Sequence, residues 1–186
     1  MIITLLLVGC GQDFVTADDS GSMVSLEYGD FPEATDADPK ATTTCYGDND
    51  WTGSGNCGFW GTSSGSWTYT SGTTWGYYYD DVRYTTSNSA YWYYYWQAPV
   101  NGTAKFYAWI PSNHATATVT YDYYCATSSG SVSSSSVSVN QNSTSSAYVY
   151  LGSKTSKNGY VCGVFVHRTG GGSQAAADGV KITFTY

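Results

Sequence analysis

Apolar and polar residues alternate along several short segments of this chain. In a β-strand, successive side chains point to opposite faces, so alternation indicates one face in a core and one in water. The last segment shows this most clearly, with apolar side chains at Val180, Ile182 and Phe184. A central segment repeats it, and its predicted core side chains are Ala104, Phe106, Ala108 and Ile110. The alternate, outward side chains of that segment are Lys105, Tyr107 and Trp109.

Eight segments read as strands, bounded by Gly, Asn, Ser or Pro: residues 65–70, 90–96, 103–110, 116–124, 136–141, 148–151, 160–167 and 180–186. No segment has a long apolar stripe with helical period. Short strands at regular spacing predict an all-β protein, an antiparallel, jelly-roll-like β-sandwich with a disordered or extended N-terminal tail. The expected core residues are Phe106, Ile110, Val119, Val139, Leu151, Val164, Val180 and Ile182.

The segment 90–96 is aromatic at almost every position. Pro99 and Asn101-Gly102 follow it and predict a hairpin that leads into residues 103–110. We expect Trp92, Tyr94 and Trp96 to face the core. The hairpin would then bring the outward side chains of both strands together as one exposed strip, formed by Tyr91, Tyr93, Tyr95, Tyr107 and Trp109.

Charge is scarce and unevenly distributed. Charged residues make up 11% of the 186 residues, while Tyr occurs 19 times and Trp 7 times. Most of the acidic residues precede residue 51, so the remainder of the chain is close to neutral. A nucleic-acid groove needs clustered Lys and Arg, which are missing here. Residues 11–44 are acidic and poor in apolar residues, and we expect a linker there.

The N-terminus predicts export. Residues 2–8 form an apolar run that is too short to span a bilayer and reads as a signal segment. The order Leu7-Val8-Gly9-Cys10 resembles the lipobox of bacterial lipoproteins, which implies lipidation of Cys10. Two alternatives stay open: an ordinary secretory signal with an incidental cysteine, or neither kind of signal. We assign residues 1–10 to this signal or lipobox segment.

Four further cysteines predict disulfides, because an exported chain meets an oxidising compartment. Connectivity does not follow from sequence, but we expect local pairing of Cys45 with Cys57 and of Cys125 with Cys162. The first pair would attach the tail to the domain, and the second would tie two strands. The spacing lacks any CxxC pattern, so we expect no zinc site. The sandwich domain is expected to span residues 45–186.

Several short motifs occur in the order found in one family. They are Gly65-Ser66-Trp67, Ala90-Tyr91-Trp92, Pro99-Val100-Asn101-Gly102-Thr103, Tyr107-Ala108-Trp109-Ile110-Pro111, Val139-Asn140-Gln141, Tyr148-Val149-Tyr150-Leu151-Gly152 and Ala177-Asp178-Gly179-Val180. Residues 57–186 thereby resemble the golvesin C-terminal-like domain, also described as the xanthan-lyase carbohydrate-binding-like domain. The resemblance implies a β-sandwich accessory module, often attached to secreted enzymes that act on polysaccharide. It supplies no catalytic residues.

Candidate chemistry is limited to the aromatic strip. Aromatic rings offer large contact areas with polar tips, which suits stacking on sugars; the alternative is that the strip packs under a loop or a partner. The segment 75–79 is a second aromatic cluster with the same two interpretations. Carboxylates at Asp80, Asp81 and Asp178 are more typical of turns than of a calcium site. Nothing places two carboxylates or a Ser–His–Asp set across a cleft.

We therefore expect an extracellular or cell-surface protein that binds polysaccharide and is not an enzyme, with no cofactor and no metal. Its membrane contact would be through a lipid anchor alone. The alternative function is a structural subunit of an extracellular filament, coat or surface assembly. Low charge, abundant Ser, Thr and Tyr, and disulfides favour that alternative, in which identical subunits self-assemble.

Overall fold

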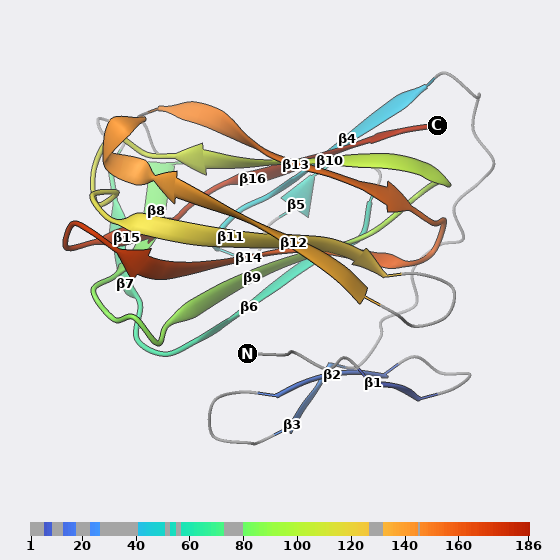
Figure 1. Cartoon of the computed structure of the whole chain (residues 1–186), viewed down its shortest axis with the longest axis horizontal. Coiled ribbons are helices and arrows are strands. Elements are labelled where there is room, and N and C mark those ends of the chain that lie inside the picture. Colours follow the sequence, from blue (N-terminus) through green and yellow to red (C-terminus); the bar gives the residue numbers. More distant parts are fainter. Residues whose placement is uncertain are drawn as a thin grey trace.

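The structure is a computed structural model. It describes residues 41–50, 57–72, 80–126, 132–144 and 146–186, together with the backbone of residues 6–8, 13–17, 23–26 and 53–54. Two five-stranded antiparallel sheets pack face to face, so the chain is an all-β sandwich (Figure 1). The described residues contain no helix with the length and apolarity needed to cross a membrane.

The first sheet, called the β10 sheet, has the order β13 (Ala147–Ser156), β10 (Gly102–Ile110), β16 (Val180–Thr185), β4 (Thr42–Gly47) and β5 (Gly53–Ser54). The second, called the β9 sheet, has the order β12 (Val132–Asn140), β11 (Thr118–Ala126), β14 (Val161–Gly170), β9 (Tyr91–Gln97) and β6 (Phe59–Ser64). A short 3₁₀ turn, η3 (Gln141–Ser143), follows β12.

Two smaller sheets complete the described strands. One has the order β15 (Ala175–Ala177), β8 (Asp81–Thr85) and β7 (Thr68–Ser71). The other has the order β1 (Leu6–Val8), β2 (Asp13–Ala17) and β3 (Met23–Leu26), and it falls within the segments predicted as signal and linker. Cys10 and residues 75–79 lie outside the described residues.

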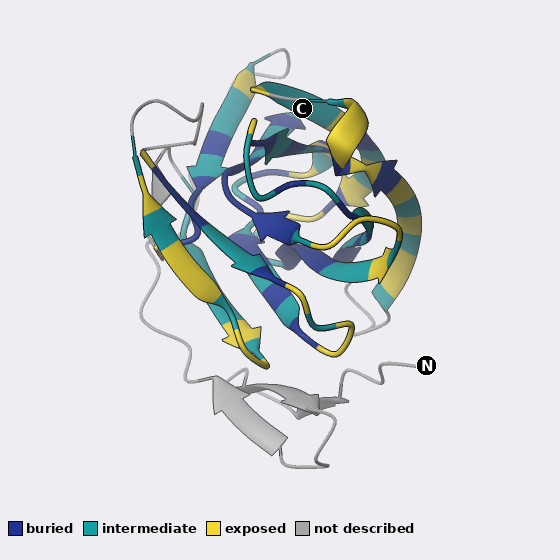
Figure 2. Ribbon diagram, turned by 90° about the vertical axis from the view of Figure 1, so that its left-hand side faces the viewer, coloured by how far each residue is buried: buried dark blue, intermediate teal, exposed yellow. Residues whose placement is uncertain are grey.

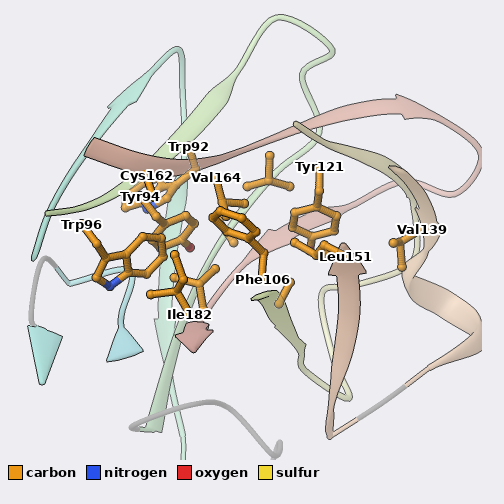
Figure 3. Close-up of a cluster of buried hydrophobic side chains, with 14 of the residues drawn as sticks. Trp92, Tyr94, Trp96, Phe106, Tyr121, Val139, Leu151, Cys162, Val164 and Ile182 are labelled. Atoms are coloured by element: carbon orange, nitrogen blue, oxygen red, sulfur yellow. The ribbon is translucent and has the colours of Figure 1, made fainter. Parts of the chain in front are cut away.

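The core between the two large sheets is the one that alternation predicts. All eight expected core residues are buried, from Phe106 at 0% exposed to Val139 at 8%. Trp92, Tyr94 and Trp96 also face inward, as expected, and belong to the same buried cluster as Phe106 and Ile182 (Figure 3). Buried and more exposed positions alternate along the strands, because each sheet has one dry and one wet face (Figure 2).

The predicted hairpin between residues 90–96 and 103–110 is wrong. β9 and β10 belong to different sheets, and the segment between them crosses from one sheet to the other. Ala98 donates its amide to Tyr160 O (2.8 Å), and Val100 is buried on the way across. Asn101 Oδ1 accepts the amide of Asn158 at 3.1 Å instead of closing a tight turn. Both strands carry a large apolar set, and each set is buried in the core between the two sheets.

Both predicted disulfides are confirmed. Cys45 of β4 is bonded to Cys57, just before β6, so this bond connects the two sheets. Cys125 of β11 and Cys162 of β14 are bonded and are also register partners in the β9 sheet. All but Cys57 are buried in the core.

Candidate functional site

The five residues predicted as one strip lie on opposite outer faces of the sandwich. Tyr107 and Trp109 alternate with buried residues of β10 and project from the outer face of the β10 sheet. Tyr91, Tyr93 and Tyr95 alternate with buried residues of β9 and project from the outer face of the β9 sheet. The prediction of a single strip is wrong, because the chain crosses from one sheet to the other after β9 and the two sets of rings therefore face opposite sides.

Four aromatic rings gather on the outer face of β10 and β13, and we call this surface the β10–β13 face: Tyr107, Trp109, Tyr148 and Tyr150. The rings of Tyr107 and Tyr150 have centroids 5.3 Å apart. Trp109 meets Tyr148 edge to face, with centroids 5.1 Å apart. Tyr150 is 52% exposed and the other three are partly exposed, so the surface remains open to a ligand.

A β-bulge creates this surface. In the register of β10 with β13, Phe106 pairs with Gly152 and Tyr107 pairs with Tyr150, so Leu151 has no partner. Because the bulge adds one residue to β13, the alternation of faces changes phase there. Leu151 points inward and is buried, whereas Tyr150 points outward beside Tyr107. Gly152 has φ of 149°, and a Cβ there would lie 2.0 Å from Tyr123 Oη. Glycine is therefore required where the bulge begins.

A lysine lies against two of the four rings, and hydroxyl groups continue the same face. Lys181 Nζ lies 4.3 Å from the ring centroids of both Tyr107 and Tyr148, which is cation–π geometry. Further along the same face the outward positions are polar, at Thr103, Lys105, Ser153, Thr155, Thr183 and Thr185. None of the outward positions of β10, β13 and β16 carries a carboxylate. The face thus has an aromatic half and a polar half.

On the opposite outer face, Tyr95 belongs to a small second core. It is 3% exposed and packs with Tyr124 and Phe165. Gly163 is the register partner of both tyrosines, and a Cβ on it would meet the Tyr124 ring at 2.7 Å. Burial raises the pKa of both tyrosine hydroxyls well above the usual range. Tyr95 is therefore a packing residue rather than part of an exposed strip.

Tyr91 and Tyr93 are partly exposed beside this cluster. Their rings stack with centroids 6.0 Å apart, and Tyr91 also contacts the His167 ring at 5.0 Å. His167 Nδ1 lies 3.8 Å from Asp122 Oδ2, which is too long for a hydrogen bond. Burial lowers the pKa of His167, and Asp122 opposes that shift. Ser136 donates its hydroxyl to Asp122, not to His167, so these three side chains do not form a nucleophile–base pair.

Buried carboxylates gather between β4 and β8. Asp48 is 1% exposed, and burial raises its pKa to about 7. Its Oδ1 accepts the amide of Asn49 at 2.7 Å, and Asn49 Nδ2 donates to Asp81 O at 3.3 Å. Burial also raises the pKa of Asp81. Over the residues that the structure describes, no three Asp, Glu, His or Cys side chains are grouped as metal ligands.

Sequence reasoning missed half of the β10–β13 face. Tyr148 and Tyr150 lie two residues apart, a spacing that puts both side chains on one face of a strand. Lys181 alternates with the buried Val180 and Ile182 and therefore lies on the outer face of β16. The sequence did not show which strands lie beside β10. It pairs with β13 and β16 rather than with β9.

No protein-family model and no curated protein sequence matches this chain. Among solved structures, a xanthan lyase from Paenibacillus superposes on 88% of the chain, with a TM-score of 0.59 and 18% identity. The match takes in 14% of the lyase's own length. A carbohydrate-binding module of the β-sandwich superfamily, described for promiscuous specificity, aligns over 91% of this chain and 70% of its own, with 14% identity and a TM-score of 0.38. The lyase likeness shows a shared β-sandwich fold and no more.

Proposed function

We propose that this chain is an extracellular, non-catalytic carbohydrate-binding module and that the β10–β13 face is its binding platform. The observation that carries the proposal is the half-exposed ring of Tyr150 beside three further aromatic rings on the same outer face. Sugar rings present apolar C–H faces, and these stack on tyrosine and tryptophan.

The order of side chains along β10 suits an extended polysaccharide. A chain lying along this strand would pass the rings of Tyr107 and Trp109 at one half of the face. At the other half it would meet the outward side chains of Thr103 and Lys105 and those of their neighbours on β13 and β16. Stacking would supply contact area, and the hydroxyl and ammonium groups would bond sugar hydroxyls.

The extracellular location rests on the two disulfides, which persist in oxidising compartments. Lipidation of Cys10 would then hold the module at a membrane surface, as the lipobox-like order predicts. Membership of the golvesin C-terminal-like family is part of the same proposal. The fold that this chain shares with a xanthan lyase makes xanthan a first polysaccharide to test.

Affinity electrophoresis through gels that contain xanthan or a neutral β-glucan tests the proposal. Tyr150→Ala should reduce retardation about fivefold, an estimate from a ring contact worth about 1 kcal/mol. Its melting temperature should stay near that of the parent, because an exposed substitution usually costs under about 0.5 kcal/mol. Tyr69→Ala is the matched control, because Tyr69 is 49% exposed on β7, outside both large sheets.

The proposal that the β10–β13 face binds polysaccharide would be wrong if the parent is not retarded, or if the Tyr150 and Tyr69 variants are retarded equally. Trp109→Ala provides a second variant, although its ring packs against Tyr148 and its loss should also lower stability slightly. A variant that keeps its fold and still binds as the parent does contradicts the assignment of Trp109.

A structural subunit is the second candidate function, and the edge strand β12 favours it. β12 extends over nine residues, carries no charge and pairs with β11 on one side alone among the described strands. Such an edge accepts a strand from a neighbouring chain unless something protects it. Size-exclusion chromatography of the parent separates the two functions, because filaments or large species favour assembly and a retarded monomer favours binding.

A further inference from the structure

A polar hollow of about 340 Å³ opens at the end of the β9 sheet, where β12 ends and β11 begins. Its side-chain walls are hydroxyls and amides, which belong to Thr116, Thr118, Asn140, Asn142 and Ser173. Two successive glycines of the β14–β15 turn complete the lining. No lining side chain is charged or aromatic, and the volume falls within the range of small-ligand sites.

Hydrogen bonds hold the walls in place. Thr116 Oγ1 accepts the amides of Ser173 (3.2 Å) and Gln174 (3.0 Å), which fixes the β14–β15 turn. Asn140 Oδ1 accepts the amide of Asn142 at 3.1 Å and so caps η3. The hollow is therefore formed before a ligand arrives, which lowers the entropic cost of binding.

The turn beneath the hollow is anchored from the core side. Gln141 is 1% exposed, and its side chain donates to Tyr121 Oη (3.0 Å) and Ala176 O (2.9 Å). The same side chain accepts the amide of Ala176 at 2.9 Å. With its amide group fully bonded, Gln141 holds η3 against β15 and keeps Asn142 at the rim.

The glycine wall admits no side chain. Gly172 has φ of 64°, and a Cβ there would lie 1.8 Å from Thr116 O. Arg168 Nη2 donates to Gly172 O at 2.8 Å and Nη1 donates to Thr86 O at 2.7 Å. Both terminal nitrogens of this arginine are thus bonded to carbonyls, and its charge is directed at the protein rather than into the hollow.

Three polar groups at the hollow have no bonding partner within the described part of the chain. They are the hydroxyl of Thr118, the Nδ2 of Asn140 and the side-chain amide of Asn142. Together they supply donors and acceptors without charge. Sugar hydroxyls also donate and accept, and a neutral ring needs no counter-charge, so the chemistry of the hollow matches an uncharged saccharide.

We propose that this hollow is a second binding site, which holds one uncharged saccharide residue by hydrogen bonds. It takes its ligand class from the proposed function but lies on the other sheet from the β10–β13 face. Thr118 and Thr120 project from the same side of β11, Thr120 pairs with His167, and His167 contacts Tyr91. A saccharide chain leaving the hollow would therefore run toward the partly exposed rings of Tyr91 and Tyr93.

Nitrogen-15 NMR titration of the whole protein tests this site. The probes are the methyl glycosides of glucose, galactose and mannose, with methyl glucuronide as a charged analogue. At least one neutral glycoside should shift the amides of Thr118, Asn142 and Gly171, and the glucuronide should bind more weakly. Asn142→Ala and Thr118→Val should each weaken binding about three- to tenfold, the effect of one lost hydrogen bond. Asn158→Ala, at an exposed turn between β13 and β14, should change nothing.

The site is overturned if no neutral glycoside shifts these amides, if the glucuronide binds equally well, or if Asn142→Ala binds as the parent does. Its failure is distinct from failure of the proposed platform. Shifts confined to the β10–β13 face, with retardation lost in Tyr150→Ala, would uphold the platform and reject the hollow. Glycoside shifts lost in Asn142→Ala, with retardation unchanged in Tyr150→Ala, would uphold the hollow and reject the platform.

Discussion

At the scale of single residues, burial sets the behaviour of several polar side chains. Asp48 Oδ2 is buried and has no hydrogen-bond partner among the described residues, while Oδ1 is bonded to Asn49. Desolvation disfavours the charged form, which is why its pKa rises to about 7. Burial shifts the pKa of Asp81 in the same direction. Repulsion by the Asp81 carboxylate adds a smaller contribution to the raised pKa of Asp48.

This shift predicts how stability depends on pH. Between about pH 4 and pH 7 the folded protein keeps a proton on Asp48 that the unfolded chain has already released. The free energy of unfolding should therefore fall as pH rises through this window and level off above it. The total fall from Asp48 is on the order of 2–4 kcal/mol, since one pKa unit corresponds to about 1.4 kcal/mol.

Asp48→Asn checks the assignment, because asparagine keeps the acceptor oxygen and removes the charge. Urea unfolding is measured at about pH 4.5, 6 and 8, which bracket the window. The free energy of unfolding of the variant should depend less on pH than that of the parent, and the variant should be the more stable of the two at the highest pH. Asp50→Asn, at the exposed neighbouring position, removes only a minor repulsion of Asp48 and should flatten the profile much less than Asp48→Asn does. A parent whose stability rises across the window would contradict the burial argument.

At the scale of elements, alternation explains which side chains of most strands are buried. β13 is the exception, because its bulge reverses the alternation partway along the strand. Residues 152–156 and 147–150 of β13 follow opposite phases, because Leu151 has no partner on β10. The sequence signal for β13 was short, covering 148–151, whereas the strand extends from Ala147 to Ser156. Its second half is polar and includes Gly152, so composition alone favours a loop there.

Gly152→Ala tests the bulge. A Cβ would collide with Tyr123 Oη, and φ of 149° is strained for alanine, so unfolding should become easier by about 1–3 kcal/mol. Thermal melting measures this loss. Gly170→Ala in β14 is the matched control, because a Cβ at Gly170 has no atom within 4 Å, and its melting temperature should barely change. Equal melting of the two variants would show that the bulge does not need glycine.

At the scale of the whole molecule, one disulfide links the two sheets and the other links two strands of the same sheet. Cys45–Cys57 joins the two sheets and closes 12 residues, while Cys125–Cys162 joins paired strands and closes 37 residues. Both bonds restrict the unfolded chain, by about 3 and about 4 kcal/mol in the loop-entropy model. Each should therefore contribute to stability, and the bond that closes the longer loop should contribute more.

Replacing each pair with alanine tests this. Cys125→Ala/Cys162→Ala should lower the urea midpoint at least as much as Cys45→Ala/Cys57→Ala, each by an amount corresponding to about 2–5 kcal/mol. Thiol labelling of the denatured, unreduced parent should find none of the four cysteines free. Two or more labelled thiols, or an unchanged midpoint in both double variants, would contradict the role given to these bonds.

Sequence by itself determined the fold class, the expected core residues and the alternating faces of β9, β10 and β16. These follow from local alternation, which the pleated backbone converts into faces without reference to any other strand. The core positions of β10 and β16 were predictable for this reason. Cysteine pairing was also predicted correctly, because each cysteine's nearest partner in the chain proved to be its partner in space.

Tertiary structure alone decided which faces meet. Alternation says that Tyr95 and Tyr107 point outward, but it does not say from which sheet. Pairing joins strands far apart in the chain and depends on how two apolar faces cover each other, so β9 and β10 lie in opposite sheets instead of side by side. The bulge at Leu151 and the burial of Tyr95 over Gly163 arise from contacts between distant strands. For that reason the grouping of Tyr107, Trp109, Tyr148 and Tyr150 on one face follows from the fold and not from the chain.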